Sequence, residues 1–216
     1  MLRFQSVVFS SLLTVSAGSW AAGPNLLVNG SFEAPNAVTI SCYQNAVAGN
    51  WTSFGPTTNK GSCAVESGYS SAGLTWPIAR DGTQMWFVNF QNVVGTKIAQ
   101  TISLVANTQY TLTFSLAGID GNAVAPNVNV AIGNGVGSRN FTSTAGASWT
   151  DLAWSFTPLT TGSTTVAFTA AAGPVNLDAA YLQVGAVPEA TTTSMMAAGL
   201  VILLGIAARR RKGRQV

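Results

Sequence analysis

The amino-acid sequence predicts an all-β fold in which two antiparallel sheets pack face to face as a sandwich. Between residues 98 and 168, apolar and polar residues alternate with a period of two, as in strands that bury one face. Turn-forming residues separate these stretches, for example at Asn107 and at residues 120–122. Many short strands at this spacing are typical of a sandwich, here with eight to ten strands.

The inward-facing positions of the alternating stretches identify the predicted strands in chain order. They are Ile98, Gln100, Ile102 and Leu104; Tyr110, Leu112, Phe114 and Leu116; Val128, Val130 and Ile132; Leu152, Trp154 and Phe156; and Val166 and Phe168. We expect these side chains to face the core. Residues 34–78 are less regular and richer in Gly, Ser and Pro, so we predict a long set of loops there.

The N-terminus has the features of a secretory signal peptide in their usual order. Arg3 supplies a positive charge, and Val7 to Val15 form an apolar stretch interrupted only by Ser and Thr. Ser19 and Ala21 then place small residues at positions −3 and −1 of a cleavage site. We predict a signal peptide over residues 1–21, with a buried N-terminal helix as the alternative.

The C-terminus contains an apolar stretch followed by a basic cluster. Met195 to Ala208 contains no charge and is followed by a basic cluster that begins with Arg209, Arg210 and Arg211. Fourteen helical residues span about 21 Å, so residues 191–194 are needed to approach the roughly 30 Å of a bilayer core. Such a cluster is typical of the cytoplasmic end of a membrane helix. The sequence predicts a short transmembrane helix in the inner membrane, with a core helix as the alternative.

The positive net charge of the whole chain comes from the basic residues at its two ends. The formal net charge is +3, but the predicted domain, residues 22–186, holds four bases and six acids and has a net charge of −2. A nucleic-acid-binding domain needs a basic patch, so this function is not predicted. The chain has no histidine, which excludes Ser–His and Cys–His nucleophile systems.

Two cysteines, Cys42 and Cys63, lie in the part predicted to be exported. In an oxidising compartment such a pair favours a disulfide over two free thiols. Closing a loop of about 22 residues would stabilise the fold by roughly 3 kcal/mol. Zinc ligation is not predicted, because the chain has no histidine and no second cysteine pair.

Several short motifs in the predicted domain resemble galactose-binding-like jelly-roll domains, which include carbohydrate-binding modules and the DUF642-type extracellular proteins. In chain order they are Asn25 to Glu33, Asn50-Trp51, Asp81 to Gln84, Ile98 to Thr101 and Gly173 to Leu182. The resemblance implies an antiparallel jelly-roll β-sandwich. It also implies a structural calcium ion that joins the first strand to the last, with Glu33 and Asp178 as side-chain ligands. The alternative is that these two acids accept backbone N–H hydrogen bonds.

The tail, residues 187–216, resembles a PEP-CTERM sorting signal. Val187-Pro188-Glu189, an apolar helix and an arginine cluster occur in that order, although Ala190 stands where the second proline is usual. The resemblance implies processing by an exosortase-type protease in an exopolysaccharide-producing Gram-negative bacterium. We therefore expect an exported protein, anchored transiently by its tail and located at the cell surface or in the matrix.

Aromatic residues in the irregular region are the candidate binding residues. Tyr43, Tyr69 and Trp76 lie there, and Trp149 has outward parity with Asp151. An aromatic ring on a loop can stack on the apolar face of a sugar, whereas packing within the loops is the alternative. Trp51 and Trp154 are predicted to lie in the core.

The sequence therefore predicts a non-catalytic exported protein that binds a polysaccharide or cell-surface glycan. One alternative is a structural matrix or surface protein that acts through protein–protein contacts. The other is a glycoside hydrolase that uses two of the six carboxylates as a pair.

Overall fold

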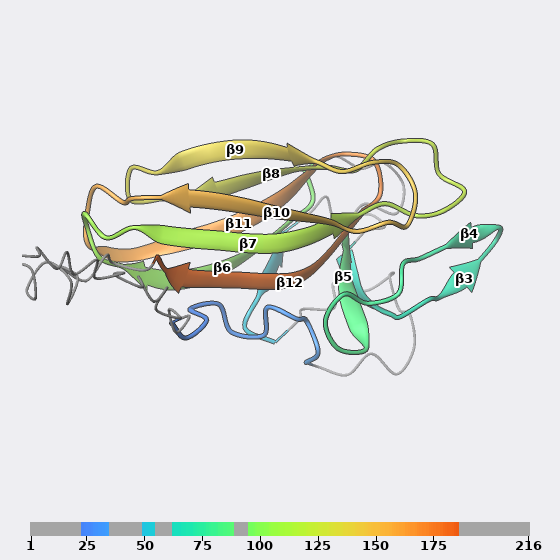
Figure 1. Cartoon of the computed structure of the whole chain (residues 1–216), viewed down its shortest axis with the longest axis horizontal. Helices are drawn as coiled ribbons and strands as arrows, with labels where there is room; N and C mark the ends of the chain where they lie inside the picture. The colour runs from blue at the N-terminus through green and yellow to red at the C-terminus, as the bar shows by residue number, and fades with distance from the viewer. Residues whose placement is uncertain (1–22, 35–48, 55–61, 89–94, 186–216) are drawn as a thin grey trace, which may run out of the picture.

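The computed structural model describes residues 23–34, 49–54, 62–88 and 95–185, which form two sheets packed face to face. In Figure 1 the strands of one sheet lie in front of those of the other. The predicted signal peptide, the tail helix, Tyr43 and Cys42 all lie outside the described residues. Across these described ranges, no helix has the length and apolar character needed to span a membrane.

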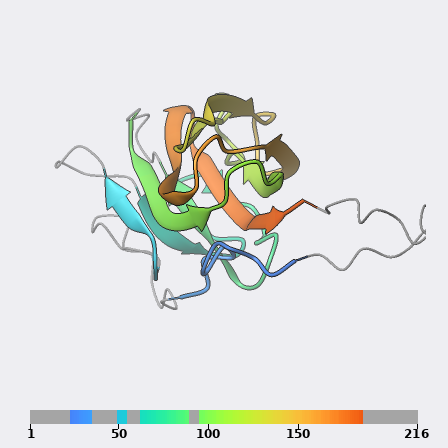
Figure 2. The same cartoon turned by 90° about the vertical axis from the view of Figure 1, so that its left-hand side faces the viewer.

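Sheet A is five-stranded, in the order β1-β6-β11-β8-β9. Its strands are β1 (Thr52–Phe54), β6 (Lys97–Leu104), β11 (Gly162–Ala172), β8 (Asn127–Ile132) and β9 (Gly137–Thr142). Every neighbouring pair is antiparallel. Figure 2 shows β1 beside β6 at one edge of the molecule.

Sheet B is also five-stranded, in the order β10-β7-β12-β5-β2. Its strands are β10 (Thr150–Phe156), β7 (Tyr110–Ala117), β12 (Val175–Val184), β5 (Gln84–Val88) and β2 (Ser62–Glu66). Two short strands, β3 (Ser70–Ser71) and β4 (Leu74–Thr75), form an arm that projects from one end of the sandwich in Figure 1.

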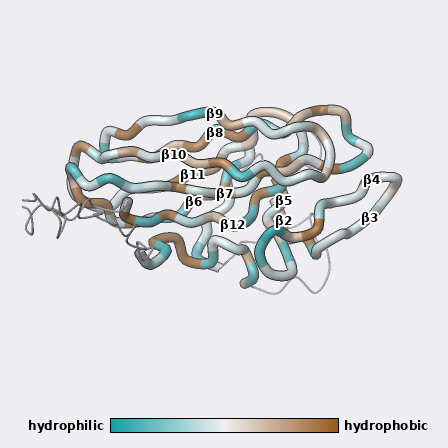
Figure 3. The backbone as a smooth tube through the Cα atoms, in the orientation of Figure 1, coloured by the Kyte–Doolittle hydropathy of each residue, from teal (hydrophilic) through white to brown (hydrophobic). Residues whose placement is uncertain are grey.

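The main core lies between the two sheets and is formed by the predicted inward-facing residues. Ile98, Leu112, Val130 and Phe168 are each at most 1% exposed, whereas Leu152 and Trp154 are partly buried against the same core. Figure 3 shows apolar and polar stretches alternating along these strands. The prediction from the period-two pattern is therefore confirmed for the fold class and for the faces of the strands.

The N-terminal segment differs from the predicted first strand. Residues 24–33 contain turns, yet they run beside β12, where the Leu26 amide donates to the Leu182 carbonyl at 2.7 Å and the Ala180 amide donates to the Gly30 carbonyl at 2.9 Å. A Cβ atom at residue 30 would lie 1.9 Å from the Ala180 carbonyl oxygen. Glycine at position 30 is therefore required for this close approach.

The prediction of loops over residues 34–78 was only partly correct, because β1 and β2 lie in this region and each pairs with a main sheet. Both strands are short, so neither carries a long alternating pattern. The arm packs over a second, smaller core around Trp76, Met85 and Phe87. This part of the chain thus adds strands to both sheets of the sandwich as well as forming loops.

Candidate functional site

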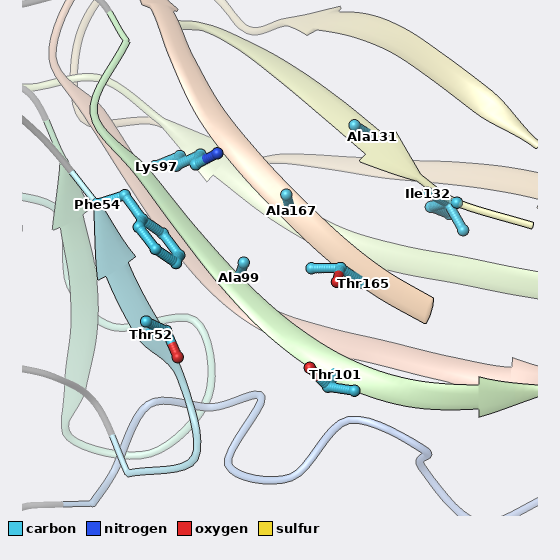
Figure 4. Close-up of a pocket in the computed structure, with 10 residues that line it drawn as sticks. Thr52, Phe54, Lys97, Ala99, Thr101, Ala131, Ile132, Thr165 and Ala167 are labelled. Atoms are coloured by element: carbon cyan, nitrogen blue, oxygen red, sulfur yellow. The ribbon is translucent and has the colours of Figure 1, made fainter. Parts of the chain in front are cut away.

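A groove crosses the outer face of sheet A, and its floor is a row of alanines. Strand pairing places Ala99 of β6 opposite Ala167 of β11, and Ala167 opposite Ala131 of β8. Figure 4 shows these three alanines in line across the three strands. Because alanine is shorter than the residues of the flanking rows, the row forms the bottom of a groove of about 520 Å³.

One side of the groove presents an aromatic ring and a cation. Phe54 of β1 lies opposite Lys97 of β6, one row away from the alanines. The Phe54 side chain is 47% exposed, and the Lys97 Nζ atom lies 4.9 Å from the centroid of its ring. This cation–π contact places the ammonium group beside an accessible aromatic face.

Hydroxyl groups lie on the rest of the lining. Thr52 of β1, Thr101 of β6 and Thr165 of β11 are all exposed and line the groove. Figure 4 shows Thr101 and Thr165 on the side of the alanine row away from Lys97. The groove therefore combines apolar surface with hydrogen-bonding groups, which suits a ligand with apolar C–H faces and many hydroxyls.

Charge is divided unequally between the two sheets. The cations Lys97 and Arg139 lie on sheet A, and among the described residues neither has a carboxylate partner. Instead, the Arg139 guanidinium lies 5.2 Å from the centroid of the Phe141 ring. The six described acids lie on sheet B, on the segment beside it, or on the connections next to it: Glu33, Glu66, Asp81, Asp120, Asp151 and Asp178.

Two of these acids hold the turn that leads into β5. Glu33 Oε1 accepts hydrogen bonds from the backbone amides of Thr83 and Gln84, both at 2.9 Å. Asp178 Oδ2 accepts from the amides of Arg80 and Asp81 at 2.8 and 3.0 Å. Residues 80–84 are thus clamped by one carboxylate from the start of the domain and another from its last strand.

The Asp178 carboxyl is fully buried, and this burial raises its pKa to about 6. The neighbouring Asp81 carboxylate acts in the same direction, whereas backbone hydrogen bonds from Asp81, Ala179 and Arg80 lower the pKa. Asp81 in turn accepts a hydrogen bond of 2.6 Å from the Tyr181 hydroxyl, and this bond raises the pKa of Tyr181. The clamp is therefore a hydrogen-bonded network that joins Asp178, Asp81 and Tyr181.

The groups around Glu33 and Asp178 are N–H and O–H donors to the two carboxylates. They do not fit a calcium ion held between these carboxylates. Each carboxylate oxygen faces an N–H or O–H donor, including the Thr83 hydroxyl at 2.7 Å from Glu33 Oε2 and the Ala179 amide at 2.7 Å from Asp178 Oδ1. Within the described segments, no group of three or more acidic or cysteine side chains could hold a metal ion. This arrangement is the predicted alternative, and we derive no role for calcium.

A further polar contact on sheet B joins Arg80 to Asp151. Arg80 Nε and Nη2 donate to the two oxygens of Asp151 at 3.2 and 2.7 Å, and the Ser115 hydroxyl donates to Asp151 Oδ1 at 2.7 Å. Together these bonds lower the pKa of Asp151. The Arg80 guanidinium is therefore already occupied by a partner within the protein.

Two of the predicted binding aromatics, Tyr69 and Trp76, pack on each other instead of forming an exposed platform. Trp76 is 2% exposed, and its ring centroid lies 5.1 Å from that of Tyr69 and 5.6 Å from that of Phe87. Trp149 is partly buried, and its indole N–H donates to the Ile78 carbonyl at 2.6 Å. In this conformation Trp76 cannot stack on a sugar, and Tyr69 and Trp149 serve the second core. Tyr43 lies outside the described residues.

Cys63 is buried in β2, at 1% exposure. Its predicted partner, Cys42, lies outside the described residues. The Cys42–Cys63 disulfide stays a prediction.

Sequence reasoning missed the groove and its aromatic residue. Phe54 lies in a strand of three residues, too short to show alternation. Ala99, Ala131 and Ala167 do have outward parity in their strands, but the sequence does not contain the register that aligns them. Pairing of residues far apart in the chain creates this floor.

Comparisons with known proteins identify the domain. Residues 25–180 match the family described as "Protein of unknown function (DUF642)". The chain belongs to this family. No curated protein sequence matches the chain.

Solved structures similar to this DUF642 protein are mostly carbohydrate-binding modules. One is TmCBM61 in complex with β-1,4-galactotriose, with 18% identity and a TM-score of 0.50 over 75% of this chain and 99% of that one. Another is the CBM22-1 xylan-binding domain of Paenibacillus barcinonensis Xyn10C, with 16% identity and a TM-score of 0.50 over 78% and 100%. The enzymatically active domain of bacteriophage CBA120 tailspike protein 4 also matches, with 13% identity and a TM-score of 0.49 over 74% and 21%. For the two carbohydrate-binding modules, each with a TM-score of 0.50, the likeness establishes a shared fold.

The tail of this DUF642 protein matches the PEP-CTERM protein-sorting motif over residues 186–212. The predicted motif residues Val187, Pro188 and Glu189 and the basic residues Arg209, Arg210 and Arg211 all lie within this match. The chain is therefore an exported protein with a C-terminal sorting signal.

Proposed function

We propose that this DUF642 protein is a non-catalytic glycan-binding protein that holds a polysaccharide in the groove of sheet A. An exosortase-type protease at the inner membrane processes its tail, and the domain then acts on cell-surface glycan or exopolysaccharide outside the cell. The observation that carries the proposal is the alanine-floored groove with the exposed Phe54 ring at its side. The fold shared with carbohydrate-binding modules supports it.

The dimensions and surface of the groove support a chain of sugars over a compact ligand. The alanine row crosses three adjacent strands, and neighbouring strands lie about 4.8 Å apart, so the floor runs about 10 Å. Methyl groups and the Phe54 ring offer surface to the C–H faces of the sugars, and the threonine hydroxyls offer hydrogen bonds.

The absence of catalytic groups from the described lining supports binding without bond cleavage. A glycosidase needs two carboxylates on either side of the scissile bond. Neither Asp nor Glu occurs among the described residues that line the groove, and the acids of the clamp and of the Arg80–Asp151 pair accept hydrogen bonds from the protein itself. A glycan that binds in the groove would therefore be released without cleavage of its glycosidic bonds.

Binding of the oxidised domain to a polysaccharide panel and to the host's own exopolysaccharide tests the proposal. We expect Phe54→Ala and the groove-filling Ala167→Gln each to weaken binding about tenfold, because the first removes stacking surface and the second blocks the floor. Leu159→Ala is the matched control, since Leu159 is 70% exposed and does not line the groove. Equal binding by all four proteins would place the site elsewhere, and release of reducing sugar would contradict the non-catalytic assignment. If no glycan binds, the structural matrix alternative is favoured, and self-assembly is then the property to measure.

A further inference from the structure

We propose that the glycan held in this groove is acidic, and that Lys97 pairs with a carboxylate on one of its sugars. This inference rests on the proposed function and names the substrate class of the same site. It is carried by the position of Lys97 and by the distribution of charge over the two sheets.

Lys97 is placed to meet a ligand. It lines the groove, and its Nζ atom lies beside the exposed ring of Phe54. Among the described residues it has no carboxylate partner, unlike Arg80, which is paired with Asp151. A sugar that stacks on Phe54 therefore brings a substituent of its ring within reach of an ammonium group that the described part of the protein leaves without a counter-charge.

The surroundings of the groove favour an anion over a neutral ligand. Its described lining holds one cation and no acid, and the six described acids are all associated with the opposite sheet. The other residues of the Lys97 row are neutral: Phe54, Thr169, Asn129 and Asn140. A carboxylate entering here meets an attractive charge, and none of the described residues that line the groove is acidic.

The lining also matches the rest of an acidic sugar. Thr52, Thr101 and Thr165 can donate to and accept from ring hydroxyls, as serine and threonine hydroxyls do both. Asn129 donates to Asn140 at 2.7 Å, so the amides at the far end of the row are already held in place. One cation among neutral hydrogen-bonding groups is suited to a uronic acid polymer, with about one charge per sugar, more than to a densely sulfated chain.

Matched pairs of polymers test the inference. Polygalacturonate, alginate and hyaluronate are each compared with the same polymer after reduction of its carboxyl groups, in EDTA, by calorimetry or affinity electrophoresis. We expect at least one acidic form to bind about five- to tenfold more tightly than its reduced form. Raising sodium chloride from about 50 to about 500 mM is expected to remove this preference, because the partly exposed charge is screened.

Variants assign the preference to the residue. Lys97→Gln should abolish the preference for the acidic form over the reduced form, and Lys97→Arg should retain most of that preference. Arg139→Gln is the matched control, because Arg139 is the other described cation of sheet A and does not line the groove. A thermal melt of each variant verifies its fold.

The outcomes separate the two proposals. Equal binding of acidic and reduced forms, a preference that survives Lys97→Gln, or stronger binding of dextran sulfate than of any uronate would overturn the inference and leave the glycan-binding proposal standing. Failure of every polymer, acidic or neutral, together with the host's exopolysaccharide, to bind the wild-type domain would overturn both.

Discussion

The outer face of sheet A and the clamped turn beside sheet B both use charged side chains, but for different ends. Around the turn, Glu33 and Asp178 accept hydrogen bonds from the protein's own backbone. On the outer face of sheet A, Lys97 lies against the Phe54 ring without a carboxylate partner among the described residues. Charges of the first kind hold the fold together, whereas charges of the second kind remain available to a ligand.

The difference teaches where to look for function in a fold of this kind. A buried or fully hydrogen-bonded carboxylate stabilises the fold, because its removal leaves hydrogen-bond donors without partners. A partly exposed cation without a carboxylate partner gains no ion-pair stabilisation from the described part of the protein, so it can pair with a ligand instead. Variants on the two sides should therefore separate stability from binding.

The largest expected effect belongs to Gly30→Ala, on the clamped side. The new Cβ would lie 1.9 Å from the Ala180 carbonyl oxygen, so the N-terminal segment must move away from β12 and lose its hydrogen bonds to that strand. We expect a loss of about 3 kcal/mol or more in the free energy of unfolding, measured by urea denaturation. Gly23→Ala is the control, because nothing lies within 4 Å of its Cβ. An equally small loss in both variants would show that the contact with β12 does not hold the segment.

A pH-dependent effect follows for Asp178→Asn. Because burial raises the folded-state pKa of Asp178 to about 6 from its ordinary value of 3.8, the contribution of its titration is fully present below pH 4 and is lost as the pH rises through 6. The difference in unfolding free energy between wild type and Asp178→Asn should therefore shift in favour of the wild type by up to about 3 kcal/mol from pH 8 to pH 4. Phe54→Ala, on the other sheet, should give a difference that is flat with pH. A flat profile for Asp178→Asn as well would contradict the burial argument.

The smallest expected effect is that of calcium. Since donors already face the oxygens of Glu33 and Asp178, we expect the same melting temperature in calcium chloride and in EDTA. A bound ion at a hundred times its dissociation constant would stabilise the domain by about 2.7 kcal/mol and raise the melting temperature by about 5–10 °C. A rise of that size, lost in Glu33→Gln, would restore the shared calcium site and end the contrast drawn between the two sides.

The sequence was sufficient for the fold because burial of alternate residues is a local signal. The stretches from Ile98 to Leu104 and from Tyr110 to Leu116 show this pattern and lie in β6 and β7. The alternating pattern missed β1, β2, β5 and β9, which have three, five, five and six residues. At that length a strand is defined by its neighbours and not by its own period.

The site was harder to predict because it depends on register and on three-dimensional packing. Trp76 and Tyr69 have the composition of a binding loop, yet they pack against Phe87 because the arm encloses a core of its own. Phe54 and Lys97 are 43 positions apart and become neighbours only when β1 pairs with β6. Local patterns carry no information on such pairings.

The position of β12 also bears on how an exported chain of this kind reaches its folded state. β12 is the central strand of sheet B and the last strand of the domain, and residues 25–30 at the other end of the domain are hydrogen-bonded to it. Sheet B cannot form completely, and the N-terminal segment cannot dock on it, until the chain up to residue 184 is available for folding. The sorting motif begins two residues later, so most of the polypeptide must cross the membrane before cooperative folding can occur. The topology thereby leaves sheet B without its central strand until nearly the whole domain is present.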